Sequence, residues 1–249
     1  MKKSFKLSAA CKLVLMAGIA STLAACGGGG GNHNNTSPVV PPPVSYAITL
    51  TGTAATGAAI VNANLTAACK VGVANAITGA EGGYTAKVPA PGEGPCIVSV
   101  VNNGVTLRSL ANGDGAKANI TPLTEMLVSY IAVSSGAGAA ATPTQLAQNA
   151  NVRTIVTNAT VLSATVNDLV QIISTATNGA VVVPADFLTA TLVPKSATNP
   201  GNAQDAVLEA LKAAKVVDTS GAIAPALLQE IRKNAAENTV TGGTGGSGN

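Results

Sequence analysis

The chain has few aromatic side chains. Its 249 residues include no Trp, three Tyr and two Phe. Aromatic rings line many pockets that bind small organic ligands, so this composition disfavours such a pocket. Hydrophobic residues make up 47% of the chain and are mostly Ala and Val. Small and β-branched residues suit strands and closely packed helices, and the length allows one or two domains with their own cores.

Residues suited to catalysis are also scarce. The single histidine, His33, lies among Gly and Asn in a linker-like stretch without a partner for a metal site or a triad. The sequence has no G-x-S-x-G, H-E-x-x-H or phosphate-loop motif, and its 11 acidic residues form no close pair for acid–base work. We therefore predict no catalytic residue, no metal site and no cofactor, and expect no enzyme. The alternative is an enzyme whose dispersed acidic residues converge on folding.

A basic surplus is missing once the first 25 residues are set aside. These contain Lys2, Lys3, Lys6 and Lys12 and no acidic residue, whereas the whole chain has 14 basic and 11 acidic residues. The remainder has 10 basic and 11 acidic residues, a net charge of 10 − 11 = −1. Nucleic-acid binding needs a surplus of Lys and Arg to neutralise phosphates, so we expect no nucleic-acid partner.

Residues 1–25 have the layout of a secretory signal peptide. The lysines precede an apolar stretch, residues 13–25, that ends in small residues. This stretch is shorter than the roughly 20 apolar residues that a membrane-spanning helix needs. We therefore expect the segment to be removed, and Cys11 with it.

Residues 23–26 read Leu-Ala-Ala-Cys. This motif resembles the lipobox of bacterial lipoproteins, which implies cleavage before Cys26, a diacylglyceryl thioether on its sulfur and an acyl group such as palmitate on its amino group. Several acyl chains together would anchor the protein stably. Gly27, where that family often has Asp for inner-membrane retention, implies the outer membrane. The alternative is an ordinary signal peptide that leaves Cys26 as a free thiol.

Residues 26–45 are rich first in Gly and then in Pro, which predicts a tether that is flexible and then more extended. Between residues 46 and 118 the hydrophobic period changes to two. Short runs rich in Thr, Val and Ile alternate with turns at Gly82-Gly83 and Asn102-Asn103-Gly104. This pattern predicts a small antiparallel β-sandwich of the transthyretin or immunoglobulin type. The expected strands cover residues 47–54, 63–71, 83–89, 96–101 and 105–111.

Two of the four cysteines, Cys69 and Cys96, remain after Cys11 and Cys26 are assigned to the signal and the lipid. In an oxidising envelope compartment we expect them to form a disulfide. Zinc would need further Cys or His ligands, and a redox pair would have C-x-x-C spacing.

The same segment resembles the carboxypeptidase regulatory-like domains, which are transthyretin-like β-sandwiches. That family has a strand ending in Gly, then a G-x-x-I/V-x-x-A-x-V stretch, then a D-G-x-Y turn. Glu81 replaces the Asp of that turn, and one more Gly precedes the Tyr. The resemblance implies a spacer or binding module without catalysis. The matching positions are Gly52, Gly57, Ile60, Ala63, Leu65, Gly82 and Tyr84.

Residues 119–238 have a helical period and predict an α-helical domain, so the fold class is α+β. Thr121 and Thr142 are placed to cap helices that begin with Pro122 and Pro143, and Gln145 completes a capping box. Further helices are expected around residues 169–176, 207–211 and 227–231, and residues 239–249 form a disordered tail. The expected apolar face of the first helix contains Leu123, Met126, Leu127, Tyr130 and Ile131.

The N-I-T-P-L-T-E run at residues 119–125 and the N-P-G-N stretch at residues 199–202 follow the sandwich-like segment. Together they resemble a group of uncharacterised, β-proteobacterial envelope lipoproteins. This resemblance covers nearly all of the mature chain and implies an envelope lipoprotein without supplying an activity.

Three weaker signals have a structural alternative. Oxygen-bearing side chains in the loop Asn112–Asn119 suggest a Ca²⁺ site, although Lys117 and a missing distal Glu favour an ordinary turn. Tyr46, Tyr84 and Tyr130 are able to stack on sugars, but isolated tyrosines are more often core residues. Tyr84 and Arg108 are also candidates for an exposed contact on the sheet.

These observations predict a lipid-anchored protein of the outer membrane, on its periplasmic or its surface side, with a binding or structural role. The expected partners are the membrane, through Cys26, and an envelope protein or glycan. A carbohydrate- or peptidoglycan-binding lipoprotein is the main alternative, which the absence of Trp disfavours.

Overall fold

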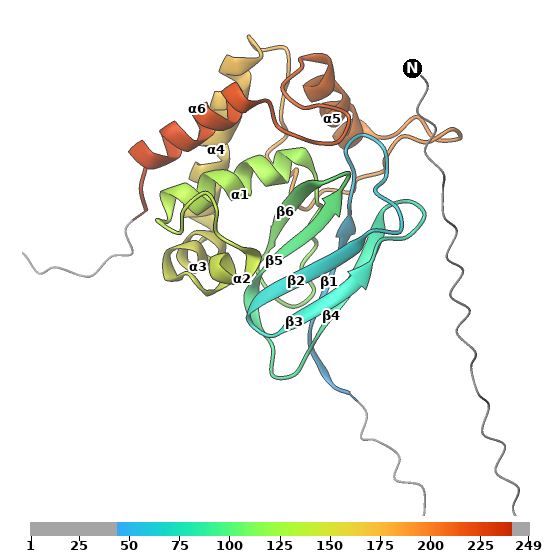
Figure 1. Ribbon diagram of the computed structural model, residues 1–249, viewed down its shortest axis with the longest axis vertical. Helices are drawn as coiled ribbons and strands as arrows, with labels where there is room; N and C mark the ends of the chain where they lie inside the picture. Colours follow the sequence, from blue (N-terminus) through green and yellow to red (C-terminus); the bar gives the residue numbers. More distant parts are fainter. Residues whose placement is uncertain (1–43, 241–249) are drawn as a thin grey trace, which may run out of the picture. The chain divides into compact units, whose positions relative to one another are not determined.

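The computed structural model describes residues 44–240, which all belong to one compact unit and form an α+β fold (Figure 1). No helix within this range is long and apolar enough to cross a membrane. The strands are β1 (Tyr46–Thr53), β2 (Asn64–Val71), β3 (Val73–Ile77), β4 (Gly83–Pro89), β5 (Glu93–Asn102) and β6 (Val105–Ala111). The helices are α1 (Pro122–Ser134), α2 (Pro143–Gln148), α3 (Ala150–Thr157), α4 (Ala159–Ala176), α5 (Ala203–Ala213) and α6 (Pro225–Glu237).

The strands form two antiparallel sheets. One contains β1 and β4, and the other has the order β3-β2-β5-β6. The predicted turns hold, because Gly82 precedes β4 with φ +74° and Asn103 and Gly104 join β5 to β6 with φ +48° and +80°. Positive φ at both central residues suits the right-handed twist of a hairpin. The sequence pattern missed β3, whose Ala and Asn residues have weak strand propensity.

One hydrophobic core lies between the two sheets. Alternate residues of each strand point into it, as the two-residue period predicts. Tyr84, Ala86 and Val88 contribute from β4, and Ile48 and Leu50 contribute from β1. From the four-stranded sheet the core includes Leu65, Ala67, Cys69, Ala74, Cys96, Val98, Val100 and Leu107.

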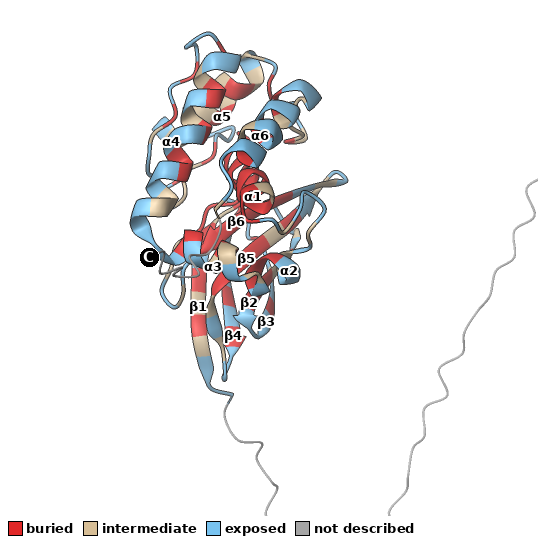
Figure 2. Cartoon of the chain, turned by 90° about the vertical axis from the view of Figure 1, so that its left-hand side faces the viewer, coloured by how far each residue is buried: buried red, intermediate tan, exposed pale blue. Residues whose placement is uncertain are grey.

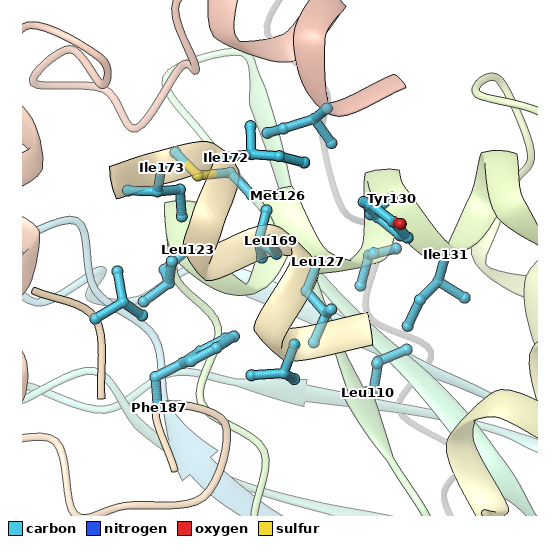
Figure 3. Packing of buried hydrophobic residues seen from close by; sticks show 14 of the residues in the cluster. Leu110, Leu123, Met126, Leu127, Tyr130, Ile131, Leu169, Ile172, Ile173 and Phe187 are labelled. Carbon is cyan, nitrogen blue, oxygen red and sulfur yellow. The ribbon is translucent and has the colours of Figure 1, made fainter. Parts of the chain in front are cut away.

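A second core joins the helices to the other face of the four-stranded sheet. Leu110 of β6 belongs to the same buried cluster as Leu127 and Ile131 of α1 (Figure 3). Ile97 of β5 is also part of this cluster. The six strands lie within residues 46–118 and the six helices of the described chain within 119–238, so this core contains residues from both ranges.

Helix α1 lies at the centre of this arrangement (Figure 2). The five residues of its expected apolar face are all buried. The helix is nevertheless not one-sided, because every residue except Val133 is buried, including Thr124 and Ser129. It packs on β6 on one side and on α4 and α6 on others. An amphipathic pattern from the sequence therefore understated how much of α1 is enclosed.

The helix starts follow the predicted caps. Thr121 and Thr142 each accept a hydrogen bond from the third helical N–H, and Pro122 and Pro143 occupy the first turns. Asn202 caps α5 in the same way. The sequence pattern missed α3, a short helix that starts at a cap by Asn149.

Candidate functional site

The predicted disulfide is present. Cys69 of β2 and Cys96 of β5 are directly opposite in the antiparallel register and are joined by a bond that closes a separation of 27 residues. Both cysteines are buried between the sheets. Cys26, His33 and residues 1–25 lie outside the described residues, as does most of the predicted tail.

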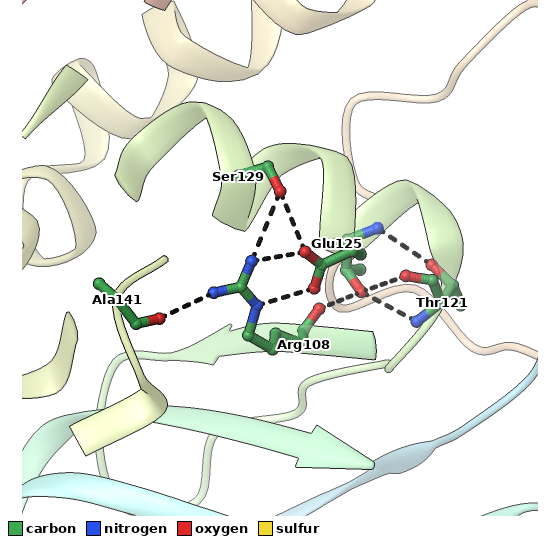
Figure 4. Close-up of polar contacts among 6 residues, drawn as sticks. Arg108, Thr121, Glu125, Ser129 and Ala141 are labelled. Atoms are coloured by element: carbon green, nitrogen blue, oxygen red, sulfur yellow. Dashed lines mark hydrogen bonds and ion pairs between the residues drawn. The ribbon is translucent and has the colours of Figure 1, made fainter. Parts of the chain in front are cut away.

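The main buried charges form a joint between the sheet and α1 (Figure 4). Arg108 of β6 donates from Nε to Oε2 of Glu125 at 2.9 Å and from Nη2 to Oε1 at 2.5 Å. Nη1 donates to the carbonyl of Ala141 at 3.2 Å, and Ser129 Oγ donates to Glu125 Oε1 at 3.0 Å. This two-bond geometry is the strongest form of an Arg–carboxylate pair. We call Arg108, Glu125, Ser129 and Ala141 the α1 joint.

The expected exposed contact of Tyr84 with Arg108 is wrong. Arg108 is buried and faces the helix layer, whereas Tyr84 is buried between the two sheets. The Tyr84 hydroxyl donates to the carbonyl of Ala118 at 2.5 Å, and burial raises the pKa of Tyr84 well above its usual value. Successive residues of a strand face opposite sides, so β6 sends Leu107 into one core and Arg108 toward the other.

The three tyrosines differ in environment. Tyr84 and Tyr130 are core residues, as the structural interpretation predicts. The Tyr130 hydroxyl lies 3.1 Å from both Asp168 Oδ2 and Asn234 Oδ1, and burial together with the Asp168 charge raises the pKa of Tyr130 to about 12. Tyr46 is instead 51% exposed, with Lys87 Nζ 5.4 Å from its ring centroid. For Tyr46 the core interpretation is wrong.

Two side-chain oxygen atoms of the loop Asn112–Asn119 accept backbone hydrogen bonds from β1. Asp114 Oδ1 accepts from the Thr49 N–H at 2.7 Å, and Asn119 Oδ1 accepts from the Thr53 N–H at 3.3 Å. Asn119 Nδ2 also donates to the Ala190 carbonyl at 2.8 Å. Lys117 Nζ donates to Thr191 Oγ1 at 3.1 Å. Within residues 44–240, no group of three or more His, Cys, Asp or Glu side chains is placed to hold a metal ion. The loop therefore acts as a structural turn that fixes β1 to the helix layer.

A small cavity of about 150 Å³ lies where the Glu81–Gly83 turn meets the segment before α5. Its polar lining consists of Thr53, Glu81, Lys195, Ser196 and Asn199. General acid–base chemistry on a glycosidic bond uses two carboxylates, and Glu81 is the one carboxylate among these lining residues. The cavity thus brings the Glu81–Gly83 turn next to Asn199 of the N-P-G-N stretch without assembling a pair of carboxylates.

Asp205 is a buried carboxylate outside the α1 joint. Asp205, in the first turn of α5, is 1% exposed, and its Oδ1 has no hydrogen-bond partner. Burial raises the pKa of Asp205, and the nearby Glu209 carboxylate acts in the same direction. This group is not among the residues that line the small cavity.

The chain enters the described structure at an apolar end of the strand layer. Three segments, Val44–Tyr46, Val71–Val73 and Pro89–Pro91, are exposed in every residue and contain no charge. Ala90 N–H donates to the Ser45 carbonyl at 3.0 Å and Tyr46 pairs with Pro89, which joins two of the segments. The third lies beside them, because a Cβ atom on Gly72 would be 3.8 Å from the Pro89 carbonyl oxygen. We call these three segments the entry tip. Sequence reasoning missed it, because short uncharged runs are common in a chain with 10% charged residues.

Comparisons of this chain with family models, curated proteins and solved structures found no match.

Proposed function

We propose that this protein is a lipid-anchored component of the bacterial outer membrane with a binding or structural role. The observation that carries the proposal is the position of Cys26, directly after Leu-Ala-Ala and a basic, then apolar, N-terminal segment. Two or more acyl chains on that residue would hold the protein stably in a bilayer, since each buried methylene contributes about 0.8 kcal/mol.

Two features of the described structure support an envelope location. The Cys69–Cys96 disulfide suits an oxidising compartment, where such bonds persist. The first described residues, Val44 and Ser45, are exposed at one end of the strand layer, which suits attachment of a tether there. Residues 26–45 would then act as the tether between the bilayer and the folded unit.

We also propose the finer fold, a β-sandwich of the carboxypeptidase regulatory-like type. The two sheets share one core, and the Gly-rich turn before Tyr84 is where that family's turn would fall. Such domains generally serve as spacers or binding modules, and the proposed role of this protein is accordingly display of the strand and helix layers to an envelope partner.

Fractionation of cells that express the full chain tests the anchor. We expect the wild-type protein to remain with the outer membrane after a high-salt wash, to enter the detergent phase on phase separation, and to incorporate a labelled fatty acid. Cys26→Ala should lose the label and enter the aqueous phase. Cys11→Ala is the matched control, because that cysteine belongs to the removed segment, and it should behave as wild type. Incorporation of the labelled fatty acid by Cys26→Ala, or no incorporation by the wild-type protein, would contradict the proposal.

A further inference from the structure

We propose that the entry tip is a second, weaker membrane contact that inserts its apolar side chains into the lipid surface to which Cys26 anchors the chain. This inference rests on the proposed lipid anchor. It assigns a role to nine exposed, uncharged residues, Val44–Tyr46, Val71–Val73 and Pro89–Pro91, which the folding of the protein does not require to be apolar.

Four large apolar or aromatic side chains of the tip are exposed. Val44 is 65% exposed, Tyr46 and Val73 are each 51% exposed, and Val71 is 38% exposed. Isolated exposed apolar residues are common on soluble proteins, but a contiguous group marks a contact surface. Tyrosine in particular favours the membrane–water boundary, where its ring lies among acyl chains and its hydroxyl remains hydrated.

The three segments form a preassembled surface. The β2–β3 turn is tight, with Gly72 at φ +91° and its carbonyl accepting from the Cys69 N–H at 3.0 Å. A Cβ atom on Gly72 would come within 2.7 Å of the Val88 side chain, so this turn packs directly against β4. The disulfide at Cys69 then ties the base of the turn to β5. Binding therefore costs little ordering entropy.

The position at which the chain enters the fold indicates that the surface contacted by the tip is the lipid bilayer. Val44 and Ser45 are part of the tip and are also the described residues nearest in the chain to Cys26. The segment 27–43 spans at most about 60 Å even when fully extended, so the anchor keeps the tip close to the bilayer. Covalent proximity of this kind raises the effective concentration of the second contact.

Charge around the tip is compatible with a lipid surface. Lys87 lies over the Tyr46 ring, and Lys70 forms an ion pair with Glu93 at the edge of the tip. Long lysine side chains extend toward the headgroup level while apolar neighbours go deeper. The helices α4, α5 and α6 lie at the other end of the molecule and would face away from this bilayer (Figures 1 and 2).

Tryptophan provides the test, because the protein contains none. The full mature protein, purified with its lipid, carries Tyr46→Trp or, as the matched control, Val101→Trp. Val101 is 60% exposed and lies at the opposite end of β5 from the tip. Both variants are placed in vesicles of phosphatidylethanolamine and phosphatidylglycerol with brominated acyl chains, which quench tryptophan on contact.

We expect the Trp at 46 to show blue-shifted emission and strong quenching in vesicles, and the Trp at 101 to show neither. Equal quenching of the two, or none at 46, would overturn the proposal. A blue shift at 46 that is already present without lipid would also overturn it, because another part of the chain or a second copy would then cover the tip.

A second pair of variants separates the tip from the anchor. In the Cys26→Ala background, Val71→Asp with Val73→Asp should weaken binding to the same vesicles at least tenfold, since two apolar side chains no longer leave water. Ile77→Asp, at the other end of β3 and 65% exposed, is the control and should change binding little. If Cys26 proves unacylated while Trp at 46 is quenched, the anchor fails and the tip contact stands. If Cys26 is acylated but Trp at 46 is not quenched, the tip contact fails and the anchor stands.

Discussion

The α1 joint and the entry tip invert the usual distribution of side chains. At the joint, a charged pair, Arg108 with Glu125, is buried between a sheet and a helix. At the tip, nine uncharged residues, several of them large and apolar, are exposed. The joint satisfies its charges with two bonds between the pair and further contacts to Ser129 and the Ala141 carbonyl.

This difference shows what each region contributes. A buried ion pair adds little net stability over an apolar replacement, but its geometry fixes how β6 and α1 meet. The exposed tip adds little to the folded state because its side chains stay in water. Changes at the joint should therefore act on folding, and changes at the tip should act on contact with other surfaces.

The largest effect on stability is expected at the joint. Arg108→Ala leaves Glu125 buried without its partner and should lower the free energy of unfolding by about 3–5 kcal/mol. Urea denaturation followed by circular dichroism measures this loss. The double variant Arg108→Met with Glu125→Leu should recover most of it, because the uncompensated charge is gone. Lys87→Ala, at an exposed lysine, is the control, and a loss at Arg108 no larger than at Lys87 would contradict this account.

The next largest effect is expected at the disulfide behind the tip. Cys69→Ala with Cys96→Ala should lower the free energy of unfolding by about 3 kcal/mol, the loop-closure contribution for a separation of 27 residues. Reduction of the wild-type protein should destabilise it by a similar amount. Reductant should leave the free energy of unfolding of the double variant unchanged. A loss of stability on reduction of that variant would contradict the assignment of the effect to the Cys69–Cys96 bond.

A smaller, pH-dependent effect on stability is expected at two carboxylates, the buried Asp205 and the exposed Asp218. Burial raises the pKa of Asp205 above its ordinary 3.8, so the unfolded chain releases this proton more readily than the folded chain. Asp205 therefore destabilises the fold progressively as pH rises from about 3.8 through its folded pKa. Relative to Asp205→Asn, the wild-type protein should gain stability as pH falls through this window.

Asp218 should behave in the opposite way. The Ser220 hydroxyl, which donates to Asp218 Oδ1 at 2.6 Å, lowers the pKa of Asp218. Its carboxylate stabilises the fold above the unfolded pKa, and that contribution is lost as pH falls through the folded pKa. Urea titrations of Asp218→Asn and Asp205→Asn across this acidic range should give slopes of opposite sign relative to wild type. Slopes of the same sign would contradict the environments assigned to the two groups.

The smallest effect on stability is expected at the tip. Val71→Asp with Val73→Asp should change the free energy of unfolding by no more than about 1 kcal/mol, because these side chains are exposed in the folded protein. Thermal melts alongside wild type measure the change. A loss comparable to that of Arg108→Ala would show that the tip serves folding and would remove the distinction between the two regions.

The sequence predicted the features that depend on neighbouring residues. Alternation of apolar residues located five of the strands, and Thr121 with Pro122 located the start of α1. The Asn103-Gly104 turn follows from the backbone conformations those residues adopt. The disulfide was also predictable, because few cysteines remained to choose from.

The features that were missed depend on segments far apart in the chain. Arg108 is buried because Glu125, on another element 17 residues away, supplies its partner, and nothing local to β6 indicates this. Tyr46 shares the alternation of Ile48 and Leu50, but the β1–β4 register shifts between Tyr46 and Ile48 and its side chain is 51% exposed. The entry tip likewise combines three segments that only the pairing of β1 with β4 and the tight β2–β3 turn bring together.

The proposed anchor depends directly on the chemistry of Cys26, so the mass of the mature protein is its most direct test. Protein purified from the membrane fraction should give an N-terminal peptide that begins at Cys26 and carries a diacylglyceryl group and an amide-linked acyl chain. A mature chain that begins at another residue, or one that begins at Cys26 with a free thiol and a free amine, would contradict the account.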